Sequence, residues 1–351
     1  MHQRRDDIDT LRGLACVMLV ALHVIGEEPA HGLGVPMNHP LEILGTLTFH
    51  LRMPLFAALA GFVYAFRPVT RGGLTAFLRG KARRLLVPMA FAATVFWLMN
   101  AATGGAFAMP LSRMWEIYLF SYAQFWFIHA VLWCFAAIAL LDLAFPNRPL
   151  TAAALLTGAG AILFLSPAAR GVDFLSLDLT LYLVPFFSAG VLLSRLPEAL
   201  FRRLILPLAV AGGLSFAIFA AASLLNPDLE HVRRAPFSLL AGATIGLALL
   251  AARPRLNALA WIGRYSFTVY LYHLIAAKIF HRAYALAGSP EPYSAALIGM
   301  GLAILVPIAL HWAAVKMGGP VPVLTLGIAS PGRRGASVQA NRLPPTPAPA
   351  E

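Results

Sequence analysis

The sequence has few charged residues and only two cysteines. Asp, Glu, Lys and Arg make up 12% of its 351 residues, whereas a soluble domain carries about 25%. With a hydrophobic content of 59% and a mean hydropathy of +0.74, this scarcity excludes an ordinary soluble protein and predicts a polytopic, all-α membrane protein. Cys16 and Cys134 lie in apolar runs, so we expect packing residues and neither a disulfide framework nor a metal site.

Motifs of several soluble enzyme classes are also missing. The sequence contains no Gly-x-Ser-x-Gly elbow, P-loop, His-Glu-x-x-His helix or paired Cys-x-x-Cys, each of which marks a known kind of catalytic or metal site. We therefore predict no metal and no bound cofactor. The formal net charge of +12 could suggest nucleic acid, but in a membrane protein basic residues report orientation, so no nucleic-acid partner is predicted.

Ten apolar segments have the length and composition of spans in a lipid bilayer. We predict helices over residues 8–26, 41–66, 85–103, 118–141, 149–166, 178–194, 204–225, 237–252, 266–281 and 294–315. With the N-terminus in the cytoplasm, 19 of the 27 Lys and Arg residues fall on the cytoplasmic side and 5 on the opposite side. This bias predicts a multi-pass protein of the inner (plasma) membrane with both termini cytoplasmic.

The chain divides into one membrane domain and a tail. We predict a transmembrane domain over residues 1–317 and a disordered cytoplasmic tail over 318–351, because the tail is rich in Pro, Gly and Ala and ends PPTPAPAE. The two arginines Arg4 and Arg5 resemble the start of a signal peptide, but Arg12 interrupts the apolar run that follows. The first span is therefore expected to be a retained signal anchor.

The first apolar run carries three ionisable residues, Asp9, Arg12 and His23. Arg12 and His23 are eleven residues apart, which closes three helical turns to within roughly 20° and separates them by about 16 Å along the axis. Ionisable groups in a span usually face a protein interior or a wet cavity, so we expect both to line one watery channel, with Asp9 offsetting the charge of Arg12. Alternatively, Arg12 anchors the helix at the lipid headgroups and His23 is a packed histidine.

The second span also holds charged and polar groups near its middle. His50 and Arg52 precede Pro54 in FHLRMPLFAALAGF, at a depth where an unpaired charge costs several kcal/mol or more. Two interpretations remain open from the residues alone. Arg52 either forms a structural salt bridge or lines a polar cavity together with the first helix.

A dense basic segment follows the second span, between Arg67 and Arg84. It explains the orientation of the neighbouring spans and would contact lipid headgroups. It would equally suit a cytoplasmic ligand that carries phosphates, because guanidinium groups bind phosphate in a bidentate manner. The candidate ligands of such an anion are Arg79, Arg83 and Arg84.

Two later spans carry further polar side chains. QFWFIHAVLW brings Gln124, Trp126 and His129 together near the predicted outer interface, where an aromatic belt would also explain the tryptophan. In IGRYSFTVYLYHLI, Tyr270 and His273 recur at helical spacing, and a polar stripe within a span normally faces protein or a cavity. These four residues (Trp126, His129, Tyr270 and His273) are candidates for positioning a substrate.

The available side chains suit acyl transfer. A neutral histidine such as His23 can accept a proton from a hydroxyl as its oxygen attacks a carbonyl group. A nearby arginine can stabilise the oxyanion that develops. No covalent nucleophile is evident, so direct transfer is favoured over a two-step reaction.

Five blocks of sequence together resemble one family. DTLRGLACVMLVALH resembles the first helix of the acyltransferase family 3 membrane proteins, which include O-antigen, exopolysaccharide and Nod-factor acyltransferases, and it matches their Arg-x10-His hallmark with Arg12 and His23. The other blocks follow in the family's order, as LRMPLFAALAGF, FLRGKARRLLVP, FWFIHAVLW and IGRYSFTVYLYHL. The second-helix motif of the family usually ends Ser-Gly-Phe, whereas this chain has Ala60-Gly61-Phe62.

The resemblance implies ten transmembrane helices and a cytoplasmic acyl-CoA donor, commonly acetyl-CoA. The acyl group would pass to a hydroxyl of a carbohydrate or glycolipid at the outer face of the membrane. His23 would be the general base and Arg12, with Asp9 beside it, would guide the pantetheine arm. His50 and Arg52 would position the thioester or its oxyanion. The nucleotide end would be held by the arginines Arg79, Arg83 and Arg84.

A transporter or flippase for a glycolipid or small anion is the competing class. It would use the same buried arginine and histidine as a binding site and proton relay. The lack of a clear two-half repeat in the sequence counts against it. A membrane-bound O-acyltransferase of another type would share the chemistry but not the Arg-x10-His helix.

Overall fold

The computed structural model describes residues 5–26, 32–36, 39–225, 234–288 and 291–328, and within these ranges the chain forms only helices and turns. The ten long helices of this part are α1 (Asp6–Ile25), α2 (Pro40–Tyr64), α3 (Leu74–Thr103), α5 (Trp126–Ala144), α6 (Pro149–Leu165), α7 (Leu177–Arg195), α8 (Glu198–Leu225), α9 (Pro236–Ala252), α11 (Ser266–Leu286) and α12 (Pro292–Met317). Each overlaps one predicted span. The shorter helices are α4 (Glu116–Leu119), α10 (Asn257–Gly263) and α13 (Val321–Leu326).

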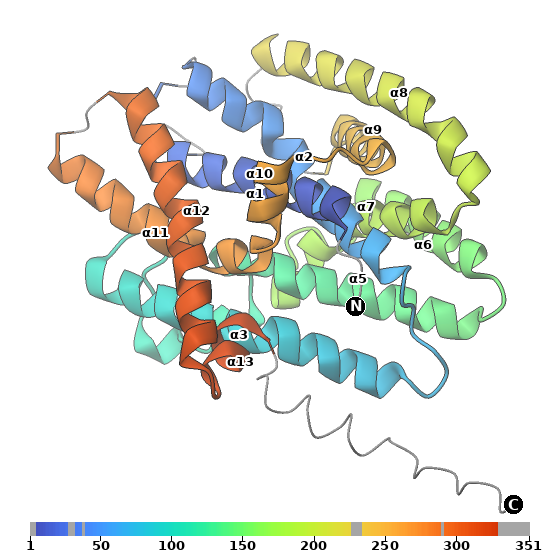
Figure 1. Ribbon diagram of the computed structural model, residues 1–351, viewed down its shortest axis with the longest axis horizontal. Coiled ribbons are helices and arrows are strands. Elements are labelled where there is room, and N and C mark those ends of the chain that lie inside the picture. Colours follow the sequence, from blue (N-terminus) through green and yellow to red (C-terminus); the bar gives the residue numbers. More distant parts are fainter. Residues whose placement is uncertain (1–4, 27–31, 37–38, 226–233, 289–290, 329–351) are drawn as a thin grey trace, which may run out of the picture.

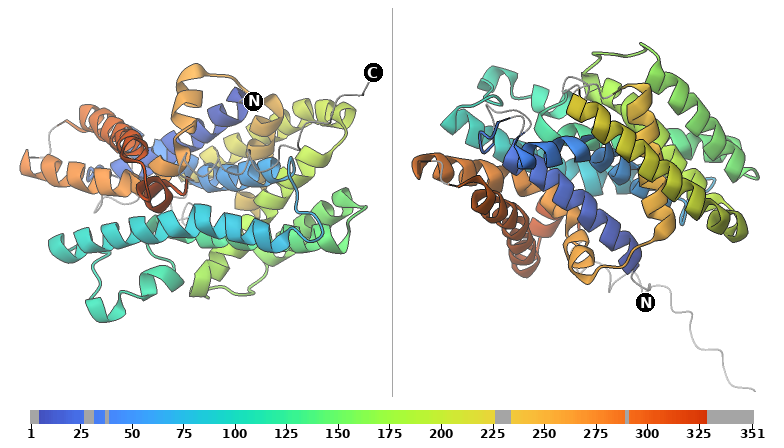
Figure 2. Two further views of the ribbon diagram at one scale, coloured as in Figure 1. Left: turned by 60° about the horizontal axis from the view of Figure 1, so that its bottom comes forward. Right: turned by 90° about the horizontal axis from the view of Figure 1, so that it is seen from above.

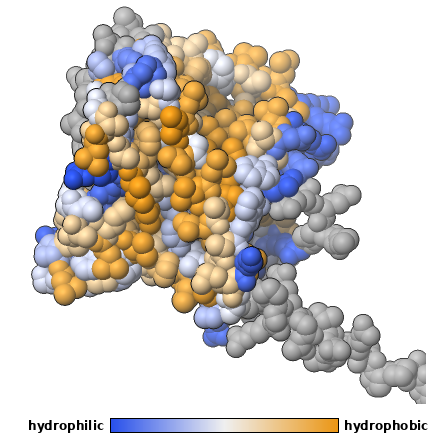
Figure 3. Space-filling view, turned by 60° about the vertical axis from the view of Figure 1, so that its left-hand side comes forward, coloured by the Kyte–Doolittle hydropathy of each residue, from blue (hydrophilic) through white to orange (hydrophobic). Residues whose placement is uncertain are grey.

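The length and apolarity of these helices fit a membrane protein. Among the described residues, seven helices could cross a membrane, or eight if the bent pair of α9 and α10 forms one span. Hydrophobic side chains cover the middle of one face of the molecule, and hydrophilic ones gather towards its edges (Figure 3). The all-α membrane fold is therefore confirmed, whereas ten crossings and the cytoplasmic location of the termini stay predictions.

The first helix lies inside the bundle. It packs against α2, α10, α11 and α12, and its path between α12 and α9 can be followed in Figure 1 and Figure 2. Small residues allow the closest of these contacts, because a β-carbon at Gly13 would collide with the backbone of Leu259, and one at Gly263 would collide with the backbone of Asp9. Backbones that approach this closely are typical of helix packing in membranes.

A buried ion pair joins α2, α5 and α7 at one end of the bundle. Both Arg195 terminal nitrogens donate to the Asp142 carboxylate, at 2.8 and 2.6 Å, and both side chains are 7% exposed. Tyr64 donates to the same carboxylate at 2.7 Å, and Arg195 also donates to the carbonyl of Pro149 at the start of α6. The carboxylate is thus satisfied by three donors, as a buried charge requires.

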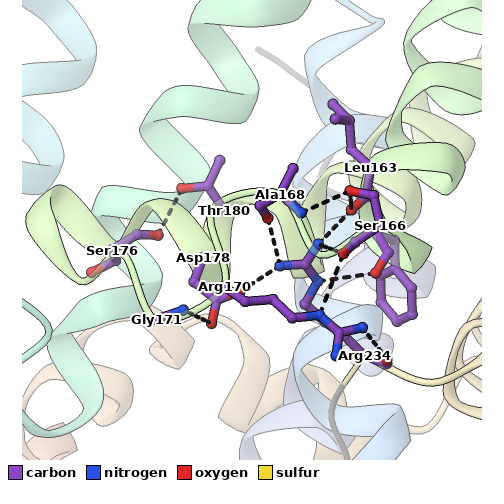
Figure 4. Close-up of polar contacts among 10 residues, drawn as sticks. Leu163, Ser166, Ala168, Arg170, Gly171, Ser176, Asp178, Thr180 and Arg234 are labelled. Carbon is purple, nitrogen blue, oxygen red and sulfur yellow. Dashed lines mark hydrogen bonds and ion pairs between the residues drawn. The ribbon is translucent and has the colours of Figure 1, made fainter.

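A second arginine closes the end of α6 (Figure 4). Arg234 donates to the carbonyl oxygens of Phe164 at 3.0 Å and Ser166 at 2.9 Å, and it pairs with the Asp178 carboxylate. The last carbonyls of a helix have no partner within the helix and carry partial negative charge. Arg234 supplies both the donors and the positive charge, and through Asp178 it ties the start of α7 (Leu177–Arg195) to the end of α6.

Packed helical structure continues beyond residue 317, where the predicted membrane domain ends. Beyond Met317, helix α13 packs against α3 and α12. Tyr272 of α11 donates to the carbonyl of Thr325 at 2.9 Å, and Gly327 lies so close to the Arg84 backbone that a β-carbon there would collide with it. The folded part therefore reaches residue 328, and the remainder of the predicted tail, 329–351, lies outside the described residues.

Candidate active site

Two histidines from distant parts of the chain lie side by side in the bundle. The ring of His23 on α1 faces the ring of His273 on α11, with 5.2 Å between their centroids. The two helices meet over several turns here, since Cys16 Sγ is 3.5 Å from the Ser266 carbonyl and His281 Nε2 is 2.8 Å from the Val24 carbonyl. The polar face predicted for α1 therefore meets the polar face predicted for α11 at the two histidines.

Hydrogen bonds fix the protonation of the His273 ring. Its Nδ1 is 2.9 Å from the carbonyl oxygens of both Val269 and Tyr270. Carbonyl oxygens only accept, so Nδ1 must carry the hydrogen and Nε2 of the neutral ring holds a lone pair. His273 is fully buried, and its Nε2 has no hydrogen-bond partner among the described residues. A buried acceptor without a partner is rare, so this nitrogen is available to a ligand or a proton.

A glutamine adds a second buried acceptor beside the same helix. Tyr270 donates its hydroxyl hydrogen to the backbone carbonyl of Gln124. The side-chain Nε2 of Gln124 donates to the backbone carbonyl of Leu271 at 3.3 Å. Gln124 Oε1 is buried and finds no partner within the described part of the chain. Sequence reasoning grouped Gln124 with the aromatic residues of the next helix and gave it no role. Its only signal was an amide in an apolar run.

The predicted contact between Asp9 and Arg12 is present, but the predicted channel is closed. Arg12 Nη1 lies 3.1 Å from Asp9 Oδ1, and the Arg12 side chain is 35% exposed. His23 is half-buried. Between them on the same helical face, Cys16 is fully buried and Leu19 is 2% exposed. In the described structure this face is thus accessible near both ends and filled by packed side chains between them.

His50 and Arg52 lie on α2 in an aromatic environment. Both are buried, and His50 Nδ1 is 2.9 Å from Ser238 Oγ on α9. Three phenylalanine rings surround the imidazole with their centroids between 4.9 and 5.4 Å away, and Arg52 lies over one of them, that of Phe49, at 4.8 Å. These contacts face α8 and α9, whereas His273 lies on α11. A direct role of His50 and Arg52 beside His23 stays a prediction.

The Trp126–His129 helix contributes one polar contact at its start. His129 is buried, and its Nδ1 lies 3.3 Å from Ser176 Oγ, which in turn accepts from Ser121 Oγ at 2.9 Å. Trp126 is less buried and packs edge-on against Phe127. His129 therefore belongs to a polar chain that runs towards the loop before α5.

The second half of the basic segment is helical, although the sequence placed it before the predicted span. Helix α3 begins at Leu74, eleven residues before the predicted start at 85, because Leu, Ala, Lys and Arg all favour helix. Arg79, Arg83 and Arg84 are exposed on its first turns, and no ion pair between described residues involves them. The first turn also has no acidic residue. These cations add to the positive N-terminal end of the helix dipole, so this end attracts anions.

The comparison with known families decides the class of protein. A family model described as an acyltransferase domain, that of acyltransferase family 3, matches residues 5–312. The chain belongs to acyltransferase family 3. The matched range includes both histidines of the pair and the basic start of α3. Searches of curated proteins and of solved structures gave no match.

Family membership and the helical fold together identify a multi-pass membrane acyltransferase. The family resemblance predicted from the five sequence blocks is thus confirmed. Because acyl transfer requires a donor, an acceptor and a way to remove the acceptor's proton, a family-3 protein must provide a site for each. The roles of individual residues in those sites are proposals.

Proposed function

We propose that this acyltransferase moves an acyl group, acetyl in the simplest case, from a cytoplasmic acyl-CoA to a hydroxyl of an extracytoplasmic carbohydrate. The observation that supports it is the contact between the half-buried His23 and the fully buried His273 within a family-3 domain. A transporter using the same buried groups was the alternative from sequence, and membership of an acyltransferase family disfavours it.

His23 is the proposed general base. As the acceptor hydroxyl attacks the thioester carbonyl, His23 takes the hydroxyl proton and the carbonyl oxygen becomes an oxyanion. When the tetrahedral intermediate collapses, the carbon–sulfur bond breaks and the new ester remains on the sugar. The imidazolium of His23 returns its proton to the departing thiolate, which leaves as CoA. The ring is then neutral again, and no covalent enzyme intermediate forms.

His273 is a positioning residue in this scheme. Its Nδ1–H is held by two carbonyls, so the ring cannot turn without losing both hydrogen bonds. It packs against the His23 ring, which limits the orientations that His23 can take. The Nε2 lone pair also makes the surroundings of His23 favourable to a positive charge.

The start of α3 is the proposed site for the nucleotide end of the donor. The phosphates of acyl-CoA would bind Arg79, Arg83 and Arg84, which lack acidic partners among the described residues. This end is connected to the histidine pair, because α13 packs beside Arg84 and accepts a hydrogen bond from Tyr272, the neighbour of His273. Arg12 is proposed to guide the pantetheine arm, and its role requires the filled face of α1 to open.

The decisive experiment uses the purified full chain with radiolabelled acetyl-CoA. We expect His23→Ala to abolish both acyl transfer to glycans and the slow hydrolysis of the thioester. Binding of CoA should stay unchanged. The matched control is His39→Asn, which removes a histidine from the N-cap of α2 while keeping a capping acceptor for Leu41. Full activity of His23→Ala would refute the assignment, and substrate accumulation in vesicles without acylation would support a transporter.

A further inference from the structure

A pocket opens at the opposite end of α3 from its basic start. Its volume is about 440 Å³, within the range of about 300–1,000 Å³ that ligand pockets occupy. It is lined by Met109, Arg113, Trp115, Glu116, Phe120, Ser121, Tyr122 and Asp173. The loop between α3 and α5 that provides most of these residues projects beyond the bundle in the left view of Figure 2. The charge bias of the sequence predicts this end to be extracytoplasmic.

The lining combines aromatic rings with carboxylates. Trp115 is 53% exposed and packs edge-on against Phe120, with 6.0 Å between ring centroids. Arg113 holds the Glu116 carboxylate with two hydrogen bonds of 2.6 and 2.7 Å. Asp173 accepts from the Ser121 backbone at 3.2 Å. A sugar ring presents apolar C–H faces and hydroxyls that both donate and accept, so it complements rings and carboxylates together.

The charge of the pocket disfavours an anionic ligand. Arg113 and Glu116 cancel each other, while no cation pairs with Asp173 among the described residues. One uncompensated negative charge therefore remains, and it repels phosphate or carboxylate groups of a ligand. A lipid-headgroup or nucleotide site would need the opposite charge.

Two sets of polar contacts lead from this pocket into the bundle. Ser121 in the lining donates to Ser176, which contacts His129 inside the bundle. Gln124 lies two residues after the lining residue Tyr122, and it contacts α11 next to His273. The backbone here is unusual, since Ala123, Leu175 and Ser176 all have positive φ without being glycine. Residues held in such conformations cluster at functional sites.

We infer that this pocket binds a neutral sugar ring of the acceptor, stacked on Trp115 and hydrogen-bonded to Asp173. This inference rests on the proposed function, because the acceptor must approach His23 from the side opposite the donor's nucleotide. The competing explanation is that Trp115 only anchors the loop at the membrane interface. The two explanations differ in whether Trp115 and Asp173 affect acyl transfer to glycans.

The test compares glycan acylation with thioester hydrolysis for each variant. Mass spectrometry gives the acyl ester content of surface glycans in cells producing the protein, and the purified full chain gives the rate of acetyl-CoA hydrolysis. We expect the ratio of the two to fall at least tenfold in Trp115→Ala and Asp173→Asn, and Trp115→Phe to restore most of it. The control is Trp133→Phe, a similarly exposed tryptophan at 45% that does not line the pocket.

Binding is measured separately by saturation-transfer NMR. The probes are the methyl glycosides of glucose, galactose, mannose and N-acetylglucosamine, with glucose 6-phosphate as the anionic comparison. We expect saturation transfer to at least one neutral glycoside, its loss in Trp115→Ala, and at least tenfold weaker binding of the phosphate.

The results separate the two proposals. An unchanged ratio in Trp115→Ala overturns the sugar site while leaving the proposed acyl transfer intact. If no variant, wild type included, hydrolyses thioester or acylates glycans, the proposed function fails and the NMR result alone decides the pocket. Glycoside binding that depends on Trp115 then supports the site, and its absence overturns it.

Discussion

Neutralising Asp142 should destabilise the bundle far more than neutralising an exposed acid. In Asp142→Asn the buried Arg195 loses the carboxylate that accepts its two bonds of 2.8 and 2.6 Å, and Tyr64 loses a charged acceptor at 2.7 Å. Breaking a buried pair by removing one partner costs about 3–5 kcal/mol. Arg195 keeps its bond to the Pro149 carbonyl, and the amide can still accept one bond, so we expect a loss of about 3 kcal/mol.

Unfolding in mixed micelles of mild detergent and dodecyl sulfate measures this loss as a change in the free energy of unfolding. The matched control is Glu198→Gln, which breaks the exposed pair of Glu198 and Arg202 and should cost at most about 1 kcal/mol. Replacing both partners, as Asp142→Leu with Arg195→Met, should recover much of the loss, since no charge is then left buried alone. Equal losses in Asp142→Asn and Glu198→Gln would refute the reasoning.

Two further predictions concern a helix cap and the donor site. The Glu291 carboxylate accepts backbone hydrogen bonds from Ser294 and Tyr293 at the start of α12, which lowers its pKa. A lowered pKa in the folded state contributes stability above the unfolded pKa, and this contribution disappears as pH falls through the folded value. The melting temperatures of wild type and Glu291→Gln should therefore differ at pH 7 and converge under acid conditions; a constant difference would exclude the cap. At the donor site, Arg83→Ala should raise the KM for acetyl-CoA roughly tenfold or more by removing a charge-assisted contact, with the exposed Arg202→Ala as control. An unchanged KM would place the nucleotide elsewhere.

Hydropathy predicted the helices well because each span is a local property of the chain. All ten predicted ranges overlap a long helix, and helical spacing identified the polar faces that carry His23 and His273. The predicted start of α3 at residue 85 was too late because the charged residues before it were left out of the apolar span, although Lys and Arg are good helix formers. Helix α13 spans only Val321–Leu326, too short for a periodic pattern to be recognised.

Pairings between distant residues could not be predicted in the same way. The partners Asp142 and Arg195 are 53 positions apart in the sequence, and nothing near either one specifies the other. The same holds for the contact between His23 and His273, which depends on how α1 crosses α11. A single sequence gives the face on which a side chain lies, whereas the packing of helices determines what it meets.

The closed face between Arg12 and His23 gives the sharpest test of the donor's route. Cys16 lies on that face and is fully buried, so a maleimide should not label it in the protein alone. If the pantetheine arm enters beside Arg12, its passage must separate α1 from α11 at the contact between Cys16 and the Ser266 carbonyl. In a Cys134→Ala background, where Cys16 is the only cysteine, we therefore expect CoA to increase labelling severalfold. Arg12→Ala should abolish that increase without affecting labelling in the absence of CoA. If CoA leaves the labelling unchanged, the donor reaches His23 along another path, such as the side of α11 that borders Tyr272 and α13. Arg12 would then stabilise the end of the helix through Asp9 and would take no part in guiding the substrate.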